Sequence, residues 1–211
     1  MPKKAGIFLV IVGTVLILSA LSLLLYNWHE DVQAGENAEN LLQSVNAVLE
    51  QRDNGNDSTE DPTEETEETE PLDPEMPVVM IDGYGYVGTL SIPALDLELP
   101  VMSEWDYNRL QKAPCRQFGS CRTDDLVIAA HNFKTHFGLL KNLVLGDSVS
   151  FTDMDGIVYD YTVDKMAILQ PTDIDGALNS GYDLVLYTCT QGGETRVTVF
   201  CNRVVSGSTE K

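Results

Sequence analysis

The stretch YDLVLYTCTQGGETRVTVFCNR, residues 182–203, decides the fold because it reads as two β-strands joined by a tight turn. Both halves are rich in β-branched and aromatic residues and alternate in polarity, a pattern typical of strands. Gly192 and Gly193 accept the positive φ angles that a tight hairpin turn requires. The hairpin is therefore expected to bring Cys189, at the end of its first strand, close to Arg196, at the start of its second.

Cys189 and Arg196 form a candidate reactive pair. A nearby cation favours the thiolate, which is the nucleophilic form of cysteine. The alternative is a buried strand cysteine beside a surface arginine, and the two residue types alone favour that interpretation. The decision between the two depends on what the rest of the chain supplies.

The folded domain is predicted to span residues 78–211 and to be mainly β. Besides the hairpin strands at 183–189 and 195–204, it contains short β-patterned runs separated by turn residues, at 86–92, 97–101, 126–130, 148–151 and 157–166. So many short strands in so few residues predict a closed barrel or a sandwich, because closure removes exposed strand edges. Short helices are expected at 105–112 and 138–143.

Residues 5–28 are predicted to form a transmembrane anchor. No charged residue occurs between Ala5 and Tyr26, and this run is long enough to cross the hydrocarbon core of a bilayer, which is about 30 Å thick. Lys3 and Lys4 precede the run, so the positive-inside rule places residues 1–4 in the cytoplasm and the remainder outside the cell. A cleaved signal peptide is disfavoured, because its apolar region spans only about 7–15 residues and ends at a small-residue cleavage site.

The chain has a formal net charge of −20, and most of it lies between residues 30 and 75, where Arg52 is the only basic residue. This acidity disfavours nucleic acid as a partner, but it describes a tail and says little about a binding face. Residues 29–52 have the apolar spacing of an amphipathic helix, which could pack on the domain, self-associate or lie near the membrane. Residues 53–77 are rich in Glu, Thr, Asp and Pro and are predicted to be a disordered spacer that holds the domain away from the bilayer.

The other three cysteines have no evident catalytic setting. Cys115 and Cys121 bracket a short polar loop and are a candidate disulfide that would pin it. Cys201 reads as a core residue, although a bond to Cys189 is an open alternative. Ligands at the spacing of a metal site do not appear, so neither a metal nor a cofactor is expected.

His131 is the candidate partner of Cys189. It directly follows the apolar run 126–130, so it is expected at a strand end, where side chains from different strands can share a groove. Thiol enzymes commonly join a cysteine and a histidine that are distant in sequence. His136, in the following loop, reads as a structural or surface residue.

These motifs together resemble the sortases, the membrane-anchored cysteine transpeptidases of Gram-positive bacteria. The resemblance is carried by Leu-Val-Ile-Ala-Ala-His at 126–131, by Leu-Tyr-Thr-Cys at 186–189, by Arg196, and upstream by Gly-Thr-Leu-Ser-Ile-Pro at 88–93 and Leu-Pro-Val at 99–101. The pattern Thr-Leu-x-Thr-Cys of the family is matched at 185–189 except that Val185 replaces its first threonine.

The resemblance implies a closed eight-stranded β-barrel in which His131, Cys189 and Arg196 share one groove. Cys189 would attack the Thr–Gly bond of an LPxTG-like sorting signal, and His131 would serve as the acid and then the base. Arg196 would bind the substrate backbone or the oxyanion, and Thr188 would help to shape the pocket. The implied partners are sorting-signal proteins and an acceptor amine of a peptidoglycan precursor or a pilin. Calcium dependence, known for some sortases, has no loop signature here.

The subclass and two rival functions remain open at this stage. Residues 131–132 and 137–141 resemble class B sortases, yet the stretch between His131 and Cys189 contains no pattern for the long helix of that class. Class C enzymes usually add an N-terminal lid and a C-terminal membrane segment, and the sequence shows no motif for either. A housekeeping-like or class D-like enzyme is the remaining alternative. One rival is an extracellular cysteine peptidase acting on cell-wall peptides, although such enzymes usually place the cysteine before the histidine. The other is an anchored peptide-binding module without catalysis, and the joint presence of His131, Cys189 and Arg196 argues against it.

Overall fold

The computed structural model describes residues 3–55, 72–173 and 175–204 of the chain. Its elements in order are α1 (Lys3–Gly55), β1 (Val79–Ile81), β2 (Tyr84–Ile92), η1 (Pro93–Leu95), β3 (Leu97–Met102), α2 (Tyr107–Leu110), β4 (Cys115–Phe118), β5 (Leu126–Ala130), η2 (Leu140–Asn142), β6 (Ser148–Asp153), β7 (Val158–Leu169), α3 (Asp175–Leu178), β8 (Leu184–Cys189) and β9 (Arg196–Arg203).

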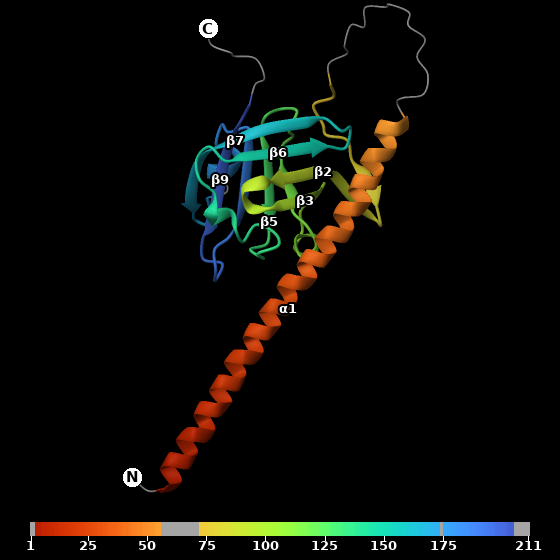
Figure 1. The fold of residues 1–211 in the computed structure, drawn as a ribbon. Coiled ribbons are helices and arrows are strands. Elements are labelled where there is room, and N and C mark those ends of the chain that lie inside the picture. Colours follow the sequence, from red (N-terminus) through yellow and green to blue (C-terminus); the bar gives the residue numbers. More distant parts are fainter. Residues whose placement is uncertain (1–2, 56–71, 174, 205–211) are drawn as a thin grey trace, which may run out of the picture.

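The strands close into a barrel. They are paired in the order β1-β2-β3-β4-β5-β8-β9-β7-β6, and β6 pairs back with β2. The closed ring therefore contains eight strands, and β1 is a short ninth strand that extends the edge of β2. This confirms the predicted eight-stranded barrel (Figure 1).

The two strands of the predicted hairpin occupy the middle of this sheet. β8 runs parallel to β5 on one side and antiparallel to β9 on the other. A parallel strand needs a crossover connection, and here β6, β7 and α3 lie in the chain between β5 and β8. The arrangement brings segments that are far apart in sequence into direct contact.

The barrel interior is apolar. One face of each strand supplies this core, because successive side chains of a strand point to opposite faces of the sheet. Cys201 belongs to it and is fully buried, as predicted. Its largest buried members include Leu90, Ile92, Leu126, Ile128, Phe137, Leu140, Phe151 and Tyr161.

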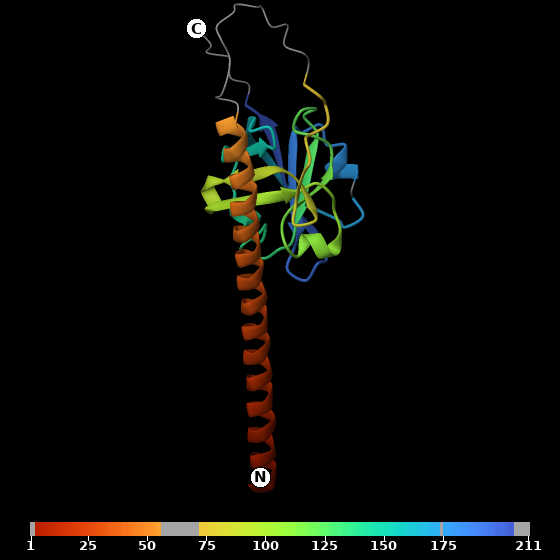
Figure 2. The same cartoon turned by 90° about the vertical axis from the view of Figure 1, so that its right-hand side faces the viewer.

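Helix α1 is one continuous helix over the residues expected to form an anchor and a separate amphipathic helix. Its first half projects from the barrel and exposes its apolar side chains, such as Leu9, Leu16 and Leu24 (Figures 1 and 2). Among the described residues it is the one helix long and apolar enough to cross a membrane. Its second half docks along the barrel and buries Ala38 and Val45. Most of the predicted acidic spacer, residues 56–71, lies outside the described residues.

Residues 115–118 differ from the prediction, because they form strand β4 rather than a loop pinned by a disulfide. Cys115 and Cys121 are both buried free thiols. The two side chains pack in different places: Cys115 lies in a cluster with Tyr86 and Met102, whereas Cys121 lies in the barrel interior. A cross-link would have to pull one of them out of its packing.

Candidate active site

The β8–β9 hairpin positions Cys189 and Arg196 as predicted. The two residues are directly paired across the antiparallel strands. Opposed residues of such a pair point to the same face of the sheet, with Cβ atoms about 4.5–5.5 Å apart. The turn between them is made possible by Gly192 and Gly193, whose φ angles are +94° and +78°. The thiol and the guanidinium therefore share one face at the end of the hairpin.

Strand β5 brings His131 to the same place. β5 and β8 are in parallel register, with Ala130 opposite Thr188, so His131 and Cys189 are the next residues along two neighbouring strands. Neighbouring strands lie about 4.8 Å apart. The hydroxyl of Thr188 donates a 2.8 Å hydrogen bond to the carbonyl oxygen of Ala130 and fixes this register where both strands end. His131, Cys189 and Arg196 thus meet at one end of the barrel.

The site lies on the outer face of the barrel wall. Thr188 is buried, and its strand neighbours Leu184 and Leu186 belong to the interior core. Cys189 alternates with Thr188 and therefore faces outward, on the same side as Tyr187. Val127, Val185 and Phe200 also lie on this outer face, where the segment that leads into β8 covers them.

A cavity of about 410 Å³ opens on this outer face. Tyr187 and Thr198 lie beside the candidate catalytic residues along it. One wall comes from the segment before β4, and the opposite wall comes from the β7–β8 connection. Its lining residues are Trp105, Tyr107, Leu110, Gln117, Ala129, Ala130, His131, Leu169, Gln170, Pro171, Asp173, Ala177, Leu178, Tyr187, Thr188, Cys189, Arg196 and Thr198. Such a groove suits an extended peptide.

Arg196 is held in place by its own turn. Its Nη1 donates hydrogen bonds to the carbonyl oxygens of Gly193 and Thr195, each at 3.0 Å. A guanidinium carries five N–H donors, so the others stay available for a ligand in the cavity. The turn therefore orients a cationic donor beside Cys189.

His131 is partly buried, and this burial lowers the pKa of its imidazole from the ordinary value. The carboxylate of Glu30 on α1 acts in the opposite direction and favours the charged ring. The ring also contacts Phe133, with the two ring centroids 5.0 Å apart. Phe133 in turn meets the ring of His136 edge-on at 5.6 Å. The histidine is thus part of an aromatic cluster next to α1.

Helix α1 holds the loop that carries His131, a contact that the sequence did not reveal. The carboxylate of Asp31 accepts a 2.7 Å hydrogen bond from the backbone N–H of Lys134, and its carbonyl oxygen accepts one of 3.1 Å from the Thr135 hydroxyl. Gly35 lies so close to Thr135 that an added Cβ would come within 2.8 Å of the threonine methyl group. The helix and the loop are therefore in close contact.

Two further features of the groove escaped the sequence analysis. The hydroxyl of Tyr187 donates a 3.1 Å hydrogen bond to Oε1 of Gln117, which joins β8 to β4 in the cavity wall. Trp105 and Tyr107 pack against each other with ring centroids 5.2 Å apart, and Tyr107 is largely exposed. Trp105 and Tyr107, just before and at the start of α2, are the signal in the sequence that could have indicated a wall of this kind.

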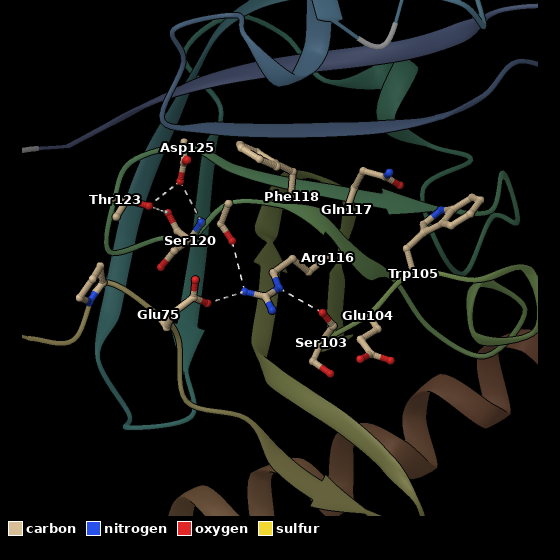
Figure 3. Close-up of a pocket in the computed structure, with 12 residues that line it drawn as sticks. Glu75, Ser103, Glu104, Trp105, Arg116, Gln117, Phe118, Ser120, Thr123 and Asp125 are labelled. Atoms are coloured by element: carbon tan, nitrogen blue, oxygen red, sulfur yellow. Dashed lines mark hydrogen bonds and ion pairs between the residues drawn. The ribbon is translucent and has the colours of Figure 1, made fainter.

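A second hollow, of about 610 Å³, adjoins the first and shares Trp105 and Gln117 with it. Figure 3 shows Arg116 reaching across this hollow toward Glu75 and Ser103. Arg116 donates to the carbonyl oxygens of Ser103 and Gly119 and pairs with Glu75 at 3.4 Å. Arg116, the cation at the centre of this hollow, is therefore already engaged. No thiol or imidazole lines the hollow. The cavity at Cys189 is the better candidate site.

The described part of the chain contains no cluster of three or more His, Cys, Asp or Glu side chains that could hold a metal ion. The available chemistry at the site is that of a thiol, an imidazole and a guanidinium. These three groups suit nucleophilic attack on a carbonyl with an acid–base partner and a donor for the developing oxyanion.

Comparison with known proteins agrees with this chemistry. A family model described as the sortase domain matches residues 90–204. A Streptococcus pneumoniae sortase C structure is 23% identical with a TM-score of 0.54, and the alignment covers 81% of this chain and 97% of that chain. A Clostridium perfringens sortase D5 transpeptidase gives 14% identity, a TM-score of 0.54 and the same coverages. A Streptococcus agalactiae sortase C1 gives 26% identity and a TM-score of 0.52 over 61% of this chain and 72% of that chain. A search of curated proteins found no match.

Proposed function

The chain belongs to the sortase family of cysteine transpeptidases. On this basis we propose that it cuts an LPxTG-like sorting signal between Thr and Gly and transfers the fragment that ends in the threonine carbonyl to an amine. The observation that carries the proposal is the meeting of His131, Cys189 and Arg196 in one cavity on the outer face of the barrel. The amine would belong to a peptidoglycan precursor or a pilin.

The first half of the reaction forms an acyl-enzyme. The Cys189 thiolate attacks the threonine carbonyl carbon, and the oxyanion that forms accepts hydrogen bonds from Arg196. His131, as imidazolium, gives its proton to the departing glycine nitrogen, and the C–N bond breaks. A thioester on Cys189 and a free amine remain.

The second half reverses these roles. Neutral His131 removes a proton from the incoming amine, whose nitrogen attacks the thioester carbonyl carbon. The tetrahedral intermediate collapses with release of the Cys189 thiolate, and a new amide bond joins the two partners. No cofactor is needed for either half. Calcium has no evident site among the described residues, and its absence from the reaction stays a prediction.

The proposed function also depends on where α1 places the enzyme. We infer that α1 anchors the chain in the cell membrane, with residues 1–4 in the cytoplasm and the barrel outside. Exported substrates held in the same membrane would then meet the enzyme at a high effective concentration.

A direct test uses the chain from residue 29 onward, because this length keeps the docked half of α1. It is mixed with a panel of LPxTG-like peptides and an added amine, and mass spectrometry follows the products. We expect a thioester on Cys189 and an amine-ligated product cut between Thr and Gly, both absent in Cys189→Ala. The matched control is Cys201→Ala, which removes a buried thiol and should keep both species.

The same experiment separates the rival functions. Release of free acid at a rate that no amine changes would indicate a peptidase, as would a thioester that only water resolves. A Cys189 that alkylating reagents label readily, but that forms no thioester with any peptide of the panel, would favour a binding module. Either result would contradict the proposed transfer.

A further inference from the structure

Helix α1 connects the membrane to the active site without a break. It is a single helix from Lys3 to Gly55, and it contacts the barrel near both ends of its docked half. At the near end, Asp31 accepts a hydrogen bond from Lys134. At the far end, Nη1 of Arg52 donates to the carbonyl oxygen of Met154 at 2.6 Å and pairs with Asp155 at 3.1 Å. These contacts lie 21 residues apart on a helix that rises about 1.5 Å per residue. The barrel is therefore held against about 30 Å of the helix.

The end of the docked half of α1 that is nearer to the proposed membrane contacts the loop that carries His131. Glu30 is close enough to His131 to favour its charged form. Asp31 binds the next loop residues, and Gly35 allows the helix to touch that loop. Figures 1 and 2 agree that the β8–β9 turn also lies at the end of the barrel nearer to the projecting half of α1. The catalytic end of the barrel therefore faces the proposed membrane.

The height of that end above the bilayer follows from helix geometry. The uncharged run from Ala5 to Tyr26 is about 33 Å long as a helix, which matches the hydrocarbon core of about 30 Å. Each polar headgroup layer adds about 5–7 Å, or about three to five residues of helix. The outer surface of the bilayer then falls near Glu30 and Asp31, the residues that reach the His131 loop.

We propose that α1 acts as a rigid ruler that holds the catalytic groove at the bilayer surface, so that the enzyme selects membrane-anchored substrates with a short spacer between the cleaved bond and their transmembrane segment. This inference rests on the proposed function, since it concerns the class of sorting signals that reaches the groove. An extended peptide spans about 3.3 Å per residue, so a few residues suffice to connect a site at this height to the bilayer.

The helix gives the proposal a precise test. Inserting seven helix-forming residues between Trp28 and His29 moves the barrel outward by about 10 Å and turns it by only about 20°, because seven residues complete almost two turns. The docked half of α1 and all its contacts stay unchanged. A matched control inserts seven Gly and Ser residues at the same point, which adds a similar length without stiffness.

The measurement uses the full chain in lipid vesicles with synthetic peptides that carry an LPxTG-type signal, a spacer of 2–20 residues and a transmembrane segment. For the unaltered chain we expect the fastest cleavage with the shortest spacers and a decline of several-fold at 20 residues. The helical insertion should raise the shortest accepted spacer by about three residues. With the flexible insertion, the cleavage rate should show no sharp minimum in the accepted spacer length. Equal rates for all spacers in all three proteins would overturn the ruler.

Two readouts keep this test apart from the proposed function. All three proteins should cleave a soluble LPxTG-type peptide equally, since the groove itself is unaltered; failure with every soluble peptide would instead overturn the transpeptidase and the ruler together. Cys189 is the only one of the four cysteines that is not buried, so a thiol dye labels it selectively. Energy transfer from this dye to acceptor-labelled headgroups should be strong and should fall with the helical insertion. Unchanged transfer would contradict the proposed geometry.

Discussion

The hydroxyl of Thr188 donates a 2.8 Å hydrogen bond to the carbonyl oxygen of Ala130 and so links the residue before Cys189 to the residue before His131. Thr188 is buried, and Val is nearly the same shape without the donor. We expect Thr188→Val to lower the free energy of unfolding by about 1–2 kcal/mol and to reduce kcat/KM about tenfold as the two strand ends lose their alignment. Urea denaturation and peptide ligation measure the two effects. Thr188→Ser keeps the hydroxyl and should retain most activity; equal loss in both variants would contradict a role for the bond.

Arg196 leads to a prediction about the shape of the cation. Its guanidinium bonds to the carbonyl oxygens of Gly193 and Thr195 and still offers donors to the groove. Lysine keeps the charge but lacks the planar fork. We expect Arg196→Lys to lower the rate of acyl-enzyme formation by about 10²–10³-fold, the usual loss for one oxyanion donor. Alkylation of Cys189 by a small reagent should stay nearly unchanged. The control is Arg203→Lys, which alters a partly exposed ion pair with Asp124 outside the cavity; a comparable loss there would show that the effect is not specific to the guanidinium beside Cys189.

His136 is predicted to make the fold sensitive to acid. It is fully buried, and this burial lowers the pKa of its imidazole from 6.5 to about 4. Between these two values the unfolded chain binds a proton that the folded chain does not, so stability falls as the pH drops below 6.5. The free energy of unfolding should decrease by about 2 kcal/mol from pH 7 to pH 5.

Replacing the titrating ring tests this assignment. His136→Phe keeps an aromatic side chain in contact with Phe133 and should remove most of the decrease, as measured by urea denaturation of residues 29–211 at both pH values. The surface-directed control His29→Phe should leave the decrease intact. If His136→Phe retains the full decrease, the acid sensitivity arises from other groups.

Asp31 is predicted to act on catalysis through the His131 loop. Asp31→Ala removes the acceptor for the backbone N–H of Lys134 and leaves the groove itself untouched. We expect kcat to fall several-fold with little change in KM, because the loop, rather than the peptide contacts, is disturbed. Glu36→Ala removes an exposed carboxylate from the same helix and should match the unaltered chain. A changed KM with an unchanged kcat would assign Asp31 to substrate binding instead.

Much of the barrel could be predicted because its signals are local. The hairpin of residues 182–203, the apolar run of β5 and the glycine turn identify their elements by pattern alone. The site followed from them, since strand ends in register place His131, Cys189 and Arg196 together. β7 is longer than predicted and continues to Leu169, because its pairing with β9 extends it past the last strongly alternating residues.

The features that escaped prediction depend on contacts between distant residues. β4 is short and polar, and one bridge between Met102 and Cys115 joins it to β3, so its sequence resembles a loop. The docking of α1 depends on Asp31 and Arg52 meeting residues more than 100 positions away. The spacing of Cys115 and Cys121 alone predicts a disulfide across a loop. In the structure the two thiols are buried in separate clusters, which the spacing does not indicate. The periodicity of apolar residues in a sequence does not indicate contacts between such distant residues.

The strand order has a consequence for when the enzyme becomes active. β8 and β9 are the last strands among the described residues, yet they lie between β5 and β7 in the sheet. With the topology proposed above, this hairpin would cross the membrane after the other barrel strands, so the barrel could not close before the hairpin arrives. Pairings between distant segments are also the slow steps of folding. The thiol and the guanidinium would thus join the imidazole only after the other strands have crossed.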